Sequence, residues 1–201
     1  MNFKSKIPSQ SDLQIWQQMK DGSEFALGNL MKMYFNPLLN YGYKFVKDED
    51  FVKDCVQEVF IEIWKRRERL SLPDSVKAYL LSSVRKKVVR EGFRQKIDKE
   101  EYELDLENNV NLIEYSFEFS LVREEEEKQL NEKIKKILDT LPKRQREVIY
   151  LQYYQNLTRD EIAKIMDINQ QSVSNLLQAA FKSFRENWEI LNIILVSFIK
   201  S

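Results

Sequence analysis

The sequence contains no histidine, one cysteine, four glycines and four prolines among its 201 residues. Without histidine the chain has no imidazole base and no mixed Cys/His zinc cluster, and Cys55 alone excludes a disulfide framework. Because glycine and proline interrupt helices, their scarcity favours an all-α fold. No set of titratable residues is arranged as a catalytic pocket, so we predict that the chain is not an enzyme and needs no metal or cofactor.

Long apolar runs are also missing from the sequence. No run reaches the roughly 18 residues that a membrane-spanning helix needs, and Met1 to Lys4 does not begin a signal peptide. These absences predict a cytoplasmic protein. Hydrophobic residues still make up 43% of the chain and aromatic residues 12%, which is enough to bury the cores of one large or two small domains.

The net charge is zero, but the charges are unevenly distributed. Residues 75–96 include seven basic residues and one acidic residue, whereas residues 97–127 include twelve acidic residues and two basic ones. The rest of the chain, from residue 128, has twelve basic and eight acidic residues. Local charge sets the affinity for a polyanion, so the two basic segments are candidates for binding nucleic acid.

Residues 141–185 predict a helix-turn-helix. Thr158 and Glu161 have the spacing of a capping box, which begins a short helix that ends near Met166. After a tight turn, a second helix repeats apolar residues at i, i+3, i+4 and i+7. Its predicted inward residues are Val173, Leu176, Leu177, Ala180, Phe181, Phe184 and Trp188. This layout is typical of a unit whose second helix lies in the major groove of DNA.

The outer face of this second helix is rich in amides. Side-chain amides can pair with adenine, serine can donate or accept, and basic residues farther along the helix can meet phosphate. The candidate DNA-binding residues are Gln170, Gln171, Ser172, Ser174, Asn175, Gln178, Lys182 and Arg185. The alternative is a helical hairpin with an ordinary solvated polar face.

The first half of the chain predicts a series of helices. The first helix is predicted from Asp12 to Met19, and Ser23 caps a second helix. A helix restarts at Asn36-Pro37, and a long helix begins at Asp48 or Asp50. The predicted buried stripe of the long helix is Val52, Val56, Val59, Phe60 and Ile63. Its predicted outer face is Asp54, Gln57, Glu58, Ile61 and Glu62. This mixed acidic face is either solvent surface or a docking face for a basic partner helix.

A basic connector follows at residues 65–74, and Ser75 begins another helix. The predicted inward residues of this helix are Val76, Tyr79, Leu80, Val84 and Val88. The basic residues of this helix that are predicted to lie largely outward are Lys77, Arg85, Lys86, Arg90 and Arg94. Together with Arg66, Arg67 and Arg69 of the connector, they are the candidate nucleic-acid contacts. Solvated lysine-rich faces normally interleave glutamate, and here Glu91 stands alone. We therefore interpret the two segments as an electrostatic track for nucleic acid.

Three short motifs occur in order along the chain. The segment Asp54–Trp64 reads D-C-V-Q-E-V-F-I-E-I-W and is similar to the pattern D-x-V-Q-E-V-F-x-x-x-W. Residues 77–85 are similar to A-W-L…A-R, and residues 141–173 are similar to L-P…R-E-V…L-S…E-I-A…I-S…T-V. Together, in this order and spacing, they resemble the sigma-70 family of transcription initiation factors, of the extracytoplasmic-function (ECF) type.

The resemblance implies an all-α fold of two small helical domains joined by a flexible linker. The expected boundaries are sigma region 2 at residues 1–96, an acidic linker at 97–121, sigma region 4 with its helix-turn-helix at 122–188, and an apolar tail at 189–201. In the linker, apolar and polar residues alternate, which favours an extended conformation or a partly disordered tether. The tail either extends the last helix and packs on region 4 or provides a docking strip for an inhibitor.

The resemblance also implies a function. A sigma factor binds core RNA polymerase and directs it to promoters; here the outer face of Asp54–Trp64 would bind polymerase. The connector and basic helix would read and open the −10 element, and the 170–185 helix would read the −35 element. The expected partners are core RNA polymerase, promoter DNA and an anti-sigma factor, membrane-anchored or not, and no direct membrane insertion is expected. The alternative is a helix-turn-helix regulator or a helical scaffold that acts without core polymerase.

The chain departs from the family pattern at several positions. Lys86 stands where an Asn usually follows Arg85, and Asp167 replaces the glycine of the turn. An Asp at a position that needs a positive φ is tolerable. Basic residues are frequent in the family at the positions of Leu176, Ala179 and Ala180.

Overall fold

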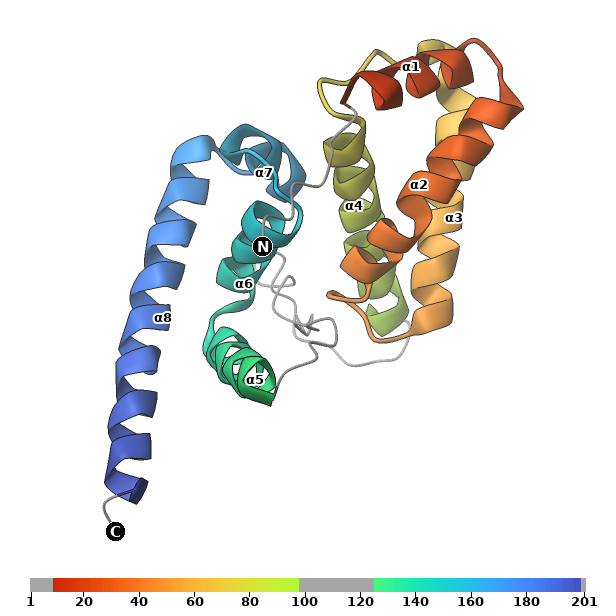
Figure 1. Cartoon of the computed structure of the whole chain (residues 1–201). Helices are drawn as coiled ribbons and strands as arrows, with labels where there is room; N and C mark the ends of the chain where they lie inside the picture. The colour runs from red at the N-terminus through yellow and green to blue at the C-terminus, as the bar shows by residue number, and fades with distance from the viewer. Residues whose placement is uncertain (1–8, 98–124, 200–201) are drawn as a thin grey trace. The chain divides into compact units, whose positions relative to one another are not determined.

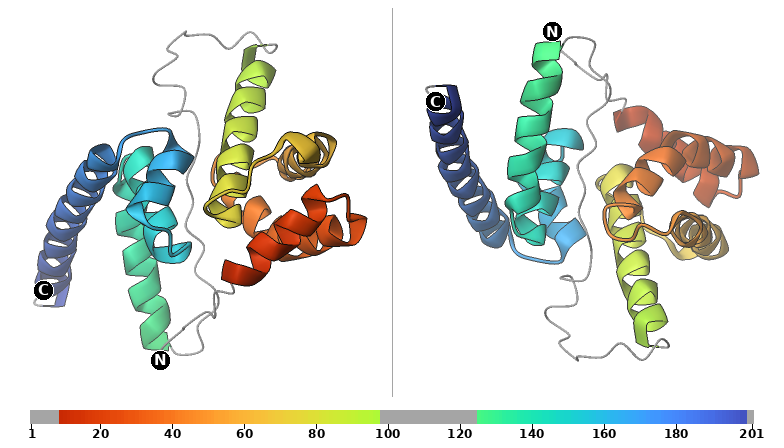
Figure 2. Two further views of the ribbon diagram at one scale, coloured as in Figure 1. Left: turned by 90° about the horizontal axis from the view of Figure 1, so that it is seen from above. Right: turned by 90° about the horizontal axis from the view of Figure 1, so that it is seen from below.

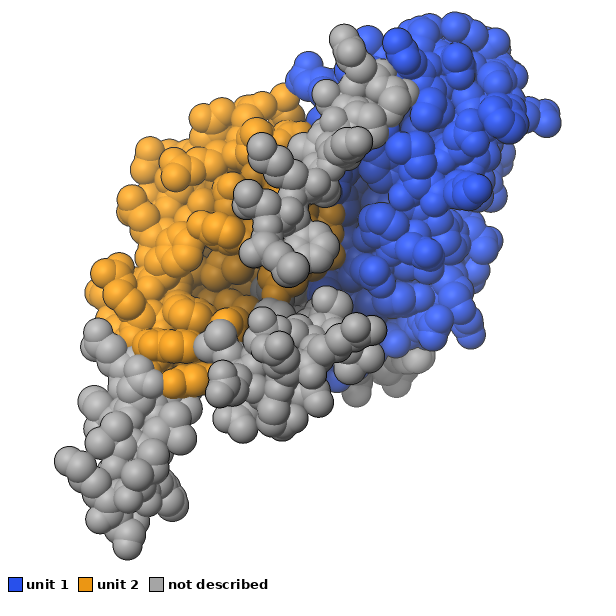
Figure 3. All heavy atoms as spheres, in the orientation of Figure 1, with its two compact units in different colours: residues 1–103 blue, residues 104–201 orange. Residues whose placement is uncertain are grey.

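Helices account for all the regular structure in the residues that the structure, a computed structural model, describes, namely 9–97 and 125–199 (Figure 1). This confirms the all-α class. The chain divides into two compact units, Met1–Glu103 and Leu104–Ser201 (Figure 3). The predicted linker, 97–121, lies almost wholly outside the described residues. Within them, no helix is long and apolar enough to cross a membrane.

Local capping sets the helix boundaries of the first unit. Its helices are α1 (Ser9–Lys20), α2 (Glu24–Gly42), α3 (Glu49–Arg66), the short 3₁₀ helix η1 (Arg67–Arg69) and α4 (Val76–Ile97). Ser23 caps α2 by accepting a hydrogen bond from the Ala26 N–H, and Asp48 caps α3 by accepting one from the Phe51 N–H. Each cap satisfies a backbone donor that has no partner inside its helix.

The predicted restart at Asn36-Pro37 is wrong, because α2 runs without interruption from Glu24 to Gly42 with Pro37 inside it. Proline cannot donate to the carbonyl of Met33, so the continuous helix loses one backbone hydrogen bond. Burial offsets that loss, since Tyr34 before the proline and Leu38 after it both lie in the core.

The core of the first unit lies among α2, α3 and α4, and α1 crosses one end of them (Figures 1 and 2). The predicted buried stripe of α3 is confirmed in full, and that of α4 is confirmed except for the half-buried Tyr79. Trp16 of α1 is fully buried, stands edge-on to Tyr79 and donates from Nε1 to the Ser71 carbonyl at 3.4 Å. These contacts tie the connector between α3 and α4 to the core.

The second unit contains the predicted helix-turn-helix. Its helices are α5 (Glu125–Thr140), α6 (Lys143–Ile149), the π-helical turn η3 (Tyr150–Tyr154), α7 (Arg159–Met166) and α8 (Gln170–Ile199). Helices α5, α6 and α7 each contact α8 (Figure 2). The backbone of the predicted tail is helical as far as Ile199, so the tail continues α8; its side chains beyond Trp188 lie outside the described residues.

The start of α7 confirms the predicted capping box. The Thr158 hydroxyl accepts a hydrogen bond from the Glu161 N–H at 3.3 Å, and the Glu161 carboxylate accepts one from the Thr158 N–H at 2.8 Å. At the other end of α7, Asp167 adopts the left-handed conformation with φ 55°. The family's usual glycine at this position is therefore explained by the backbone that the turn requires.

Replacing Asp167 by Gly is expected to stabilise the second unit by about 0.5–1 kcal/mol, because glycine has no Cβ to strain at a positive φ. Thermal unfolding followed by circular dichroism measures this as a higher Tm. Asp160→Gly is the matched control, because Asp160 lies in the first turn of α7 and there glycine should cost about 1 kcal/mol. A lower Tm for Asp167→Gly would contradict this explanation.

Candidate functional site

The predicted acidic face of α3 is exposed, but it is not one uniform surface. Glu58 and Glu62 turn toward α4, where the ammonium of Lys87 lies 2.5 Å from Glu58 Oε2 and 2.8 Å from Glu62 Oε1. The Lys87 side chain is only 8% exposed. Asp54 is exposed one turn earlier on the helix. An external partner would therefore meet Asp54 directly, whereas at Glu58 and Glu62 it would compete with Lys87.

The ion pair between Lys87 and Glu62 favours the charged forms of both groups, as the directions of their pKa shifts show. The hydrogen bond from Lys87 lowers the pKa of Glu62. Burial disfavours the charge on Lys87, but the hydrogen bonds to Glu58 and Glu62 outweigh it and raise the pKa of Lys87. In the sequence, Lys87 is simply one of the seven basic residues of the segment 75–96. Its partners lie 25 and 29 positions away, a separation at which no periodic pattern links them.

Replacing Lys87 by Met is expected to destabilise the first unit by about 1–2 kcal/mol, since it leaves two neighbouring half-exposed carboxylates without their cation. Because the pKa of Glu62 is lowered on folding, the stabilisation is present above its unfolded-state pKa and lost as the pH falls through the folded-state value. Urea unfolding at neutral and at acidic pH measures this. The exposed neighbour Lys86, replaced by Met, is the control. Equal losses for both variants at neutral pH would contradict a specific role for Lys87.

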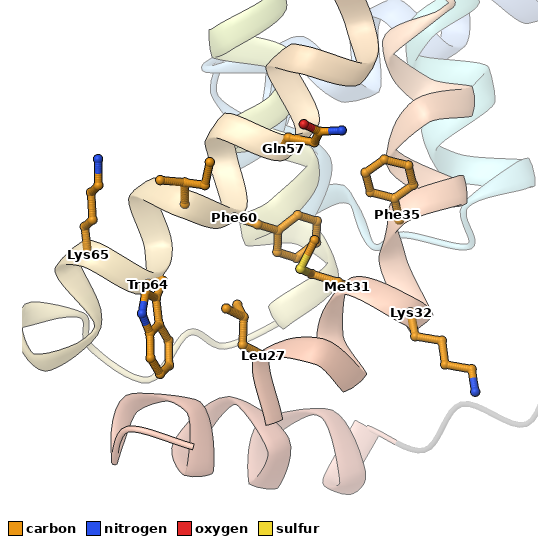
Figure 4. A pocket seen from close by; sticks show the side chains of 9 residues that line it. Leu27, Met31, Lys32, Phe35, Gln57, Phe60, Trp64 and Lys65 are labelled. Carbon is orange, nitrogen blue, oxygen red and sulfur yellow. The ribbon is translucent and has the colours of Figure 1, made fainter. Parts of the chain in front are cut away.

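The other side of α3 borders an apolar groove against α2, which we call the α2–α3 groove (Figure 4). Its volume is about 590 Å³. Its apolar lining consists of Leu27, Met31 and Phe35 from α2 and Phe60, Ile61 and Trp64 from α3. Gln57 and Ile61, two of the five residues of the predicted outer face of α3, lie on the wall of this groove. The face predicted from sequence is thus divided between the Lys87 ion pairs, the groove and the exposed carboxylate of Asp54.

Basic residues from the end of α3 and from α4 converge on a second, polar hollow. Arg66, Lys86 and Arg90 line this hollow of about 190 Å³ together with Glu62, Tyr79 and Ser83. All three cations are exposed. Hydroxyls and cations around one concave surface suit a phosphate or the polar edge of a base. The structure therefore brings together three of the eight residues predicted as the nucleic-acid track.

The remaining track residues have different surroundings. The guanidinium of Arg67 lies 4.3 Å from the centre of the Trp64 ring and donates to the Trp64 carbonyl at 3.0 Å. Arg69 is exposed, Lys77 is half-buried, and the exposed Arg94 pairs with Glu91 at 3.3 Å. These residues lie along the connector and α4, outside the lining of the hollow.

The predicted outward position of Arg85 is wrong. Its side chain is 7% exposed, and its guanidinium lies 6.0 Å from the centre of the Phe45 ring. Arg85 follows the buried Val84 on α4, so its apolar stem covers core surface while the cation interacts with an aromatic face. We therefore remove Arg85 from the candidate DNA contacts.

The outer face of α8 begins with side chains that bond to one another. Gln171 Nε2 donates to Asn175 Oδ1 at 3.0 Å, and both side chains are exposed. Gln170 donates to Asp160 of α7 at 2.9 Å, which lowers the pKa of that carboxyl. Gln178, Lys182 and Arg185 are also exposed, whereas Ser172 and Ser174 are half-buried. Gln171, Asn175 and Gln178 are thus the most accessible amides for reading base edges.

Two residues of the second unit differ from the sequence prediction. Phe181, predicted inward, is 42% exposed and stands edge-on to Tyr153 of η3, because the π-helical turn brings that ring against α8. Arg159, which sequence analysis did not select, is exposed at the start of α7 and approaches Ser174 Oγ at 3.5 Å. Only the pairing of α7 with α8 reveals that Arg159 adds a cation beside the amide face.

Comparison with known proteins identifies both units. The family model described as Sigma-70 region 2 matches residues 30–96, and the one described as Sigma-70, region 4 matches residues 131–184. The chain belongs to the sigma-70 family. The order of region 2 and then region 4 is that of an ECF sigma factor, as the motifs predicted. Sigma factors of this family direct RNA polymerase in transcription initiation.

Solved structures show the same fold. The structure of CnrH in complex with the cytosolic domain of CnrY is 17% identical with a TM-score of 0.57, covering 90% of this sigma factor and 98% of that chain. The sigma factor RpoE in complex with the anti-sigma factor NepR, from Bartonella quintana, is 16% identical with a TM-score of 0.54. The match covers 81% of this sigma factor and 96% of that chain. A comparison with curated proteins found no similar sequence.

Proposed function

We propose that this sigma factor binds core RNA polymerase through the exposed face of α3 and brings it to promoters with a −10 and a −35 element. The observation that carries the proposal is the presence, in one chain, of the region 2 and region 4 matches in the family's order. A helix-turn-helix regulator or scaffold acting without polymerase would not need region 2. We propose a cytoplasmic, regulatory and non-catalytic role, with domains at 1–96, 122–188 and a linker at 97–121.

Within region 2, Asp54, Gln57 and Ile61 are the best-placed polymerase contacts, because they are exposed and not engaged by Lys87. Glu58 and Glu62 would join the interface if polymerase cations replaced Lys87. The polar hollow formed by Arg66, Lys86 and Arg90 supports contacts to the −10 region. In region 4, the amide face of α8 supports contacts to the −35 element.

We further propose that an anti-sigma factor regulates the chain. Support comes from the two similar structures, which are complexes with the cytosolic domain of CnrY and with the anti-sigma factor NepR.

The test of the proposed function is run-off transcription with purified bacterial core polymerase, on a promoter selected from a random library. Transcripts that start at one position and appear only when the full chain is added are expected. Binding of the chain to DNA without any polymerase-dependent transcript would favour the regulator alternative.

A further inference from the structure

Glu62 belongs to two surfaces of region 2 at once. It is part of the predicted polymerase-binding face of α3, and it also lines the polar hollow beside Arg66, Lys86 and Arg90. Lys87, which is not among the candidate DNA contacts, lines the same hollow and pairs with Glu62 at 2.8 Å. The ion pair therefore stands between the surface proposed for polymerase and the surface proposed for the −10 element.

The two sides of this ion pair differ in accessibility. The side chains of Glu58 and Glu62 are 57% and 47% exposed, whereas that of Lys87 is only 8% exposed. A cation of a partner can therefore approach either carboxylate, but a phosphate cannot reach the ammonium while it lies against α3. As long as both pairs hold, Lys87 is a covered and neutralised cation in the wall of the hollow.

The surroundings of Lys87 favour its carboxylate partners in the free chain. Three exposed cations, Arg66, Lys86 and Arg90, line the hollow, and like charges disfavour a further free ammonium there. A phosphate in the hollow reverses that balance because it attracts the ammonium. The flexible stem of a lysine lets its three donors change partners, so Lys87 can exchange a carboxylate for a phosphate without a movement of α4.

We propose that Lys87 couples the two surfaces: cations of core polymerase that pair with Glu58 and Glu62 release Lys87 to a DNA phosphate in the polar hollow. That polymerase is the partner rests on the proposed function. In the free chain, Glu62 repels phosphate and holds Lys87 away from it. In the complex, polymerase neutralises Glu62 and the hollow gains one more cation.

Coupling of this kind is reciprocal. If polymerase raises the affinity of the hollow for phosphate by some factor, phosphate in the hollow raises the affinity of the chain for polymerase by the same factor. Lys87 carries the coupling because it is the group whose partner both events change. Without Lys87, the two surfaces should bind polymerase and phosphate independently.

Removing the carboxylates tests the release without polymerase. In the full chain, Glu58→Gln/Glu62→Gln keeps the shape of both side chains but frees Lys87. This double variant is expected to bind a fluorescent single-stranded oligonucleotide about fivefold more tightly at about 0.1 M salt, with a salt slope steeper by about 0.7. A single strand is the probe because a helix that lies in a major groove, as proposed for α8, needs a duplex. A misfolded protein would not show this gain.

Lys87→Met shows whether the gain comes from Lys87. It is expected to remove the gain in the double variant, where no carboxylate is left without its cation, and to change the affinity by less than about twofold in the otherwise unchanged chain. Lys86→Met is the matched control: Lys86 is exposed in both backgrounds, so its loss should weaken binding by the same factor in each. No gain from the double variant, or equal effects of Lys87→Met in the two backgrounds, would overturn the proposal.

A second arm adds core polymerase to the single variants. Lys87→Met leaves Glu58 and Glu62 open, so it is expected to bind polymerase about threefold more tightly than the unchanged chain. The holoenzyme formed with it should nevertheless hold promoter DNA with a salt slope lower by about one. Weaker polymerase binding by Lys87→Met, with an unchanged fold by circular dichroism, would overturn the release by polymerase. A chain that shows the carboxylate-dependent gain but never binds polymerase contradicts the proposed function and leaves the exchange of Lys87 between carboxylates and phosphate standing.

Discussion

Replacing Asp54 by Arg is expected to weaken the binding of core RNA polymerase by at least about tenfold, or roughly 1.4 kcal/mol. Asp54 is exposed on α3, beside Gln57 and Ile61 and apart from the Lys87 ion pairs, so reversing its charge removes an attraction to a basic partner and adds a repulsion. Co-purification with core polymerase, followed by a titration of fluorescent chain, measures the loss.

The matched control is Asp21→Arg, which makes the same charge reversal at an exposed residue in the turn between α1 and α2. It should leave polymerase binding unchanged. Glu58→Arg is less informative, because it also places a second cation beside Lys87 and disturbs the packing of α3 on α4. If Asp54→Arg and Asp21→Arg bind polymerase equally well, with unchanged helicity, the proposed face of α3 is not the docking surface.

Local patterns in the sequence were sufficient to predict the helices and the turn that carry these sites. The capping box at Thr158 and Glu161 depends on residues three positions apart, and the buried stripe of α3 depends on helical periodicity alone. The left-handed Asp167 likewise follows from the position of a tight turn after a short helix. In each case the interacting groups are close in sequence, so spacing and residue type determine the structure.

The sequence was not sufficient to predict features that depend on packing between helices, such as the position of a charged side chain. Arg85 and Lys86 are adjacent basic residues on α4, yet one lies over Phe45 in the core and the other is exposed. The next residue, Lys87, pairs with two carboxylates of α3 that are more than 20 positions away in the sequence. The charge of a segment therefore predicted an affinity for nucleic acid but not which cations are accessible. Pro37 shows the same limit, since burial on both sides of it outweighs a local helix-breaking signal.

The hydrogen bond between Gln171 and Asn175 changes what is expected of −35 recognition. Because Gln171 Nε2 donates to Asn175 Oδ1, the Gln171 Oε1 oxygen can still accept a hydrogen bond and the Asn175 Nδ2 group can still donate one. Adenine presents the complementary set in the major groove, an N6 donor and an N7 acceptor. The two amides can thus read one adenine together, each holding the other in position.

Gln171→Ala and Asn175→Ala are therefore each expected to cost about 1–3 kcal/mol at the same base pair, and the double variant little more than either one. A promoter library scored by transcription for the three variants measures both the loss and its position. Lys182→Ala is the contrast: its side chain is exposed farther along α8, so it should weaken all promoters alike and lower the salt slope by about one. Losses that add up in the double variant would show that the amides act separately. A uniform loss from the amide variants, without a changed base preference, would show that this face of α8 positions region 4 on DNA but does not read its sequence.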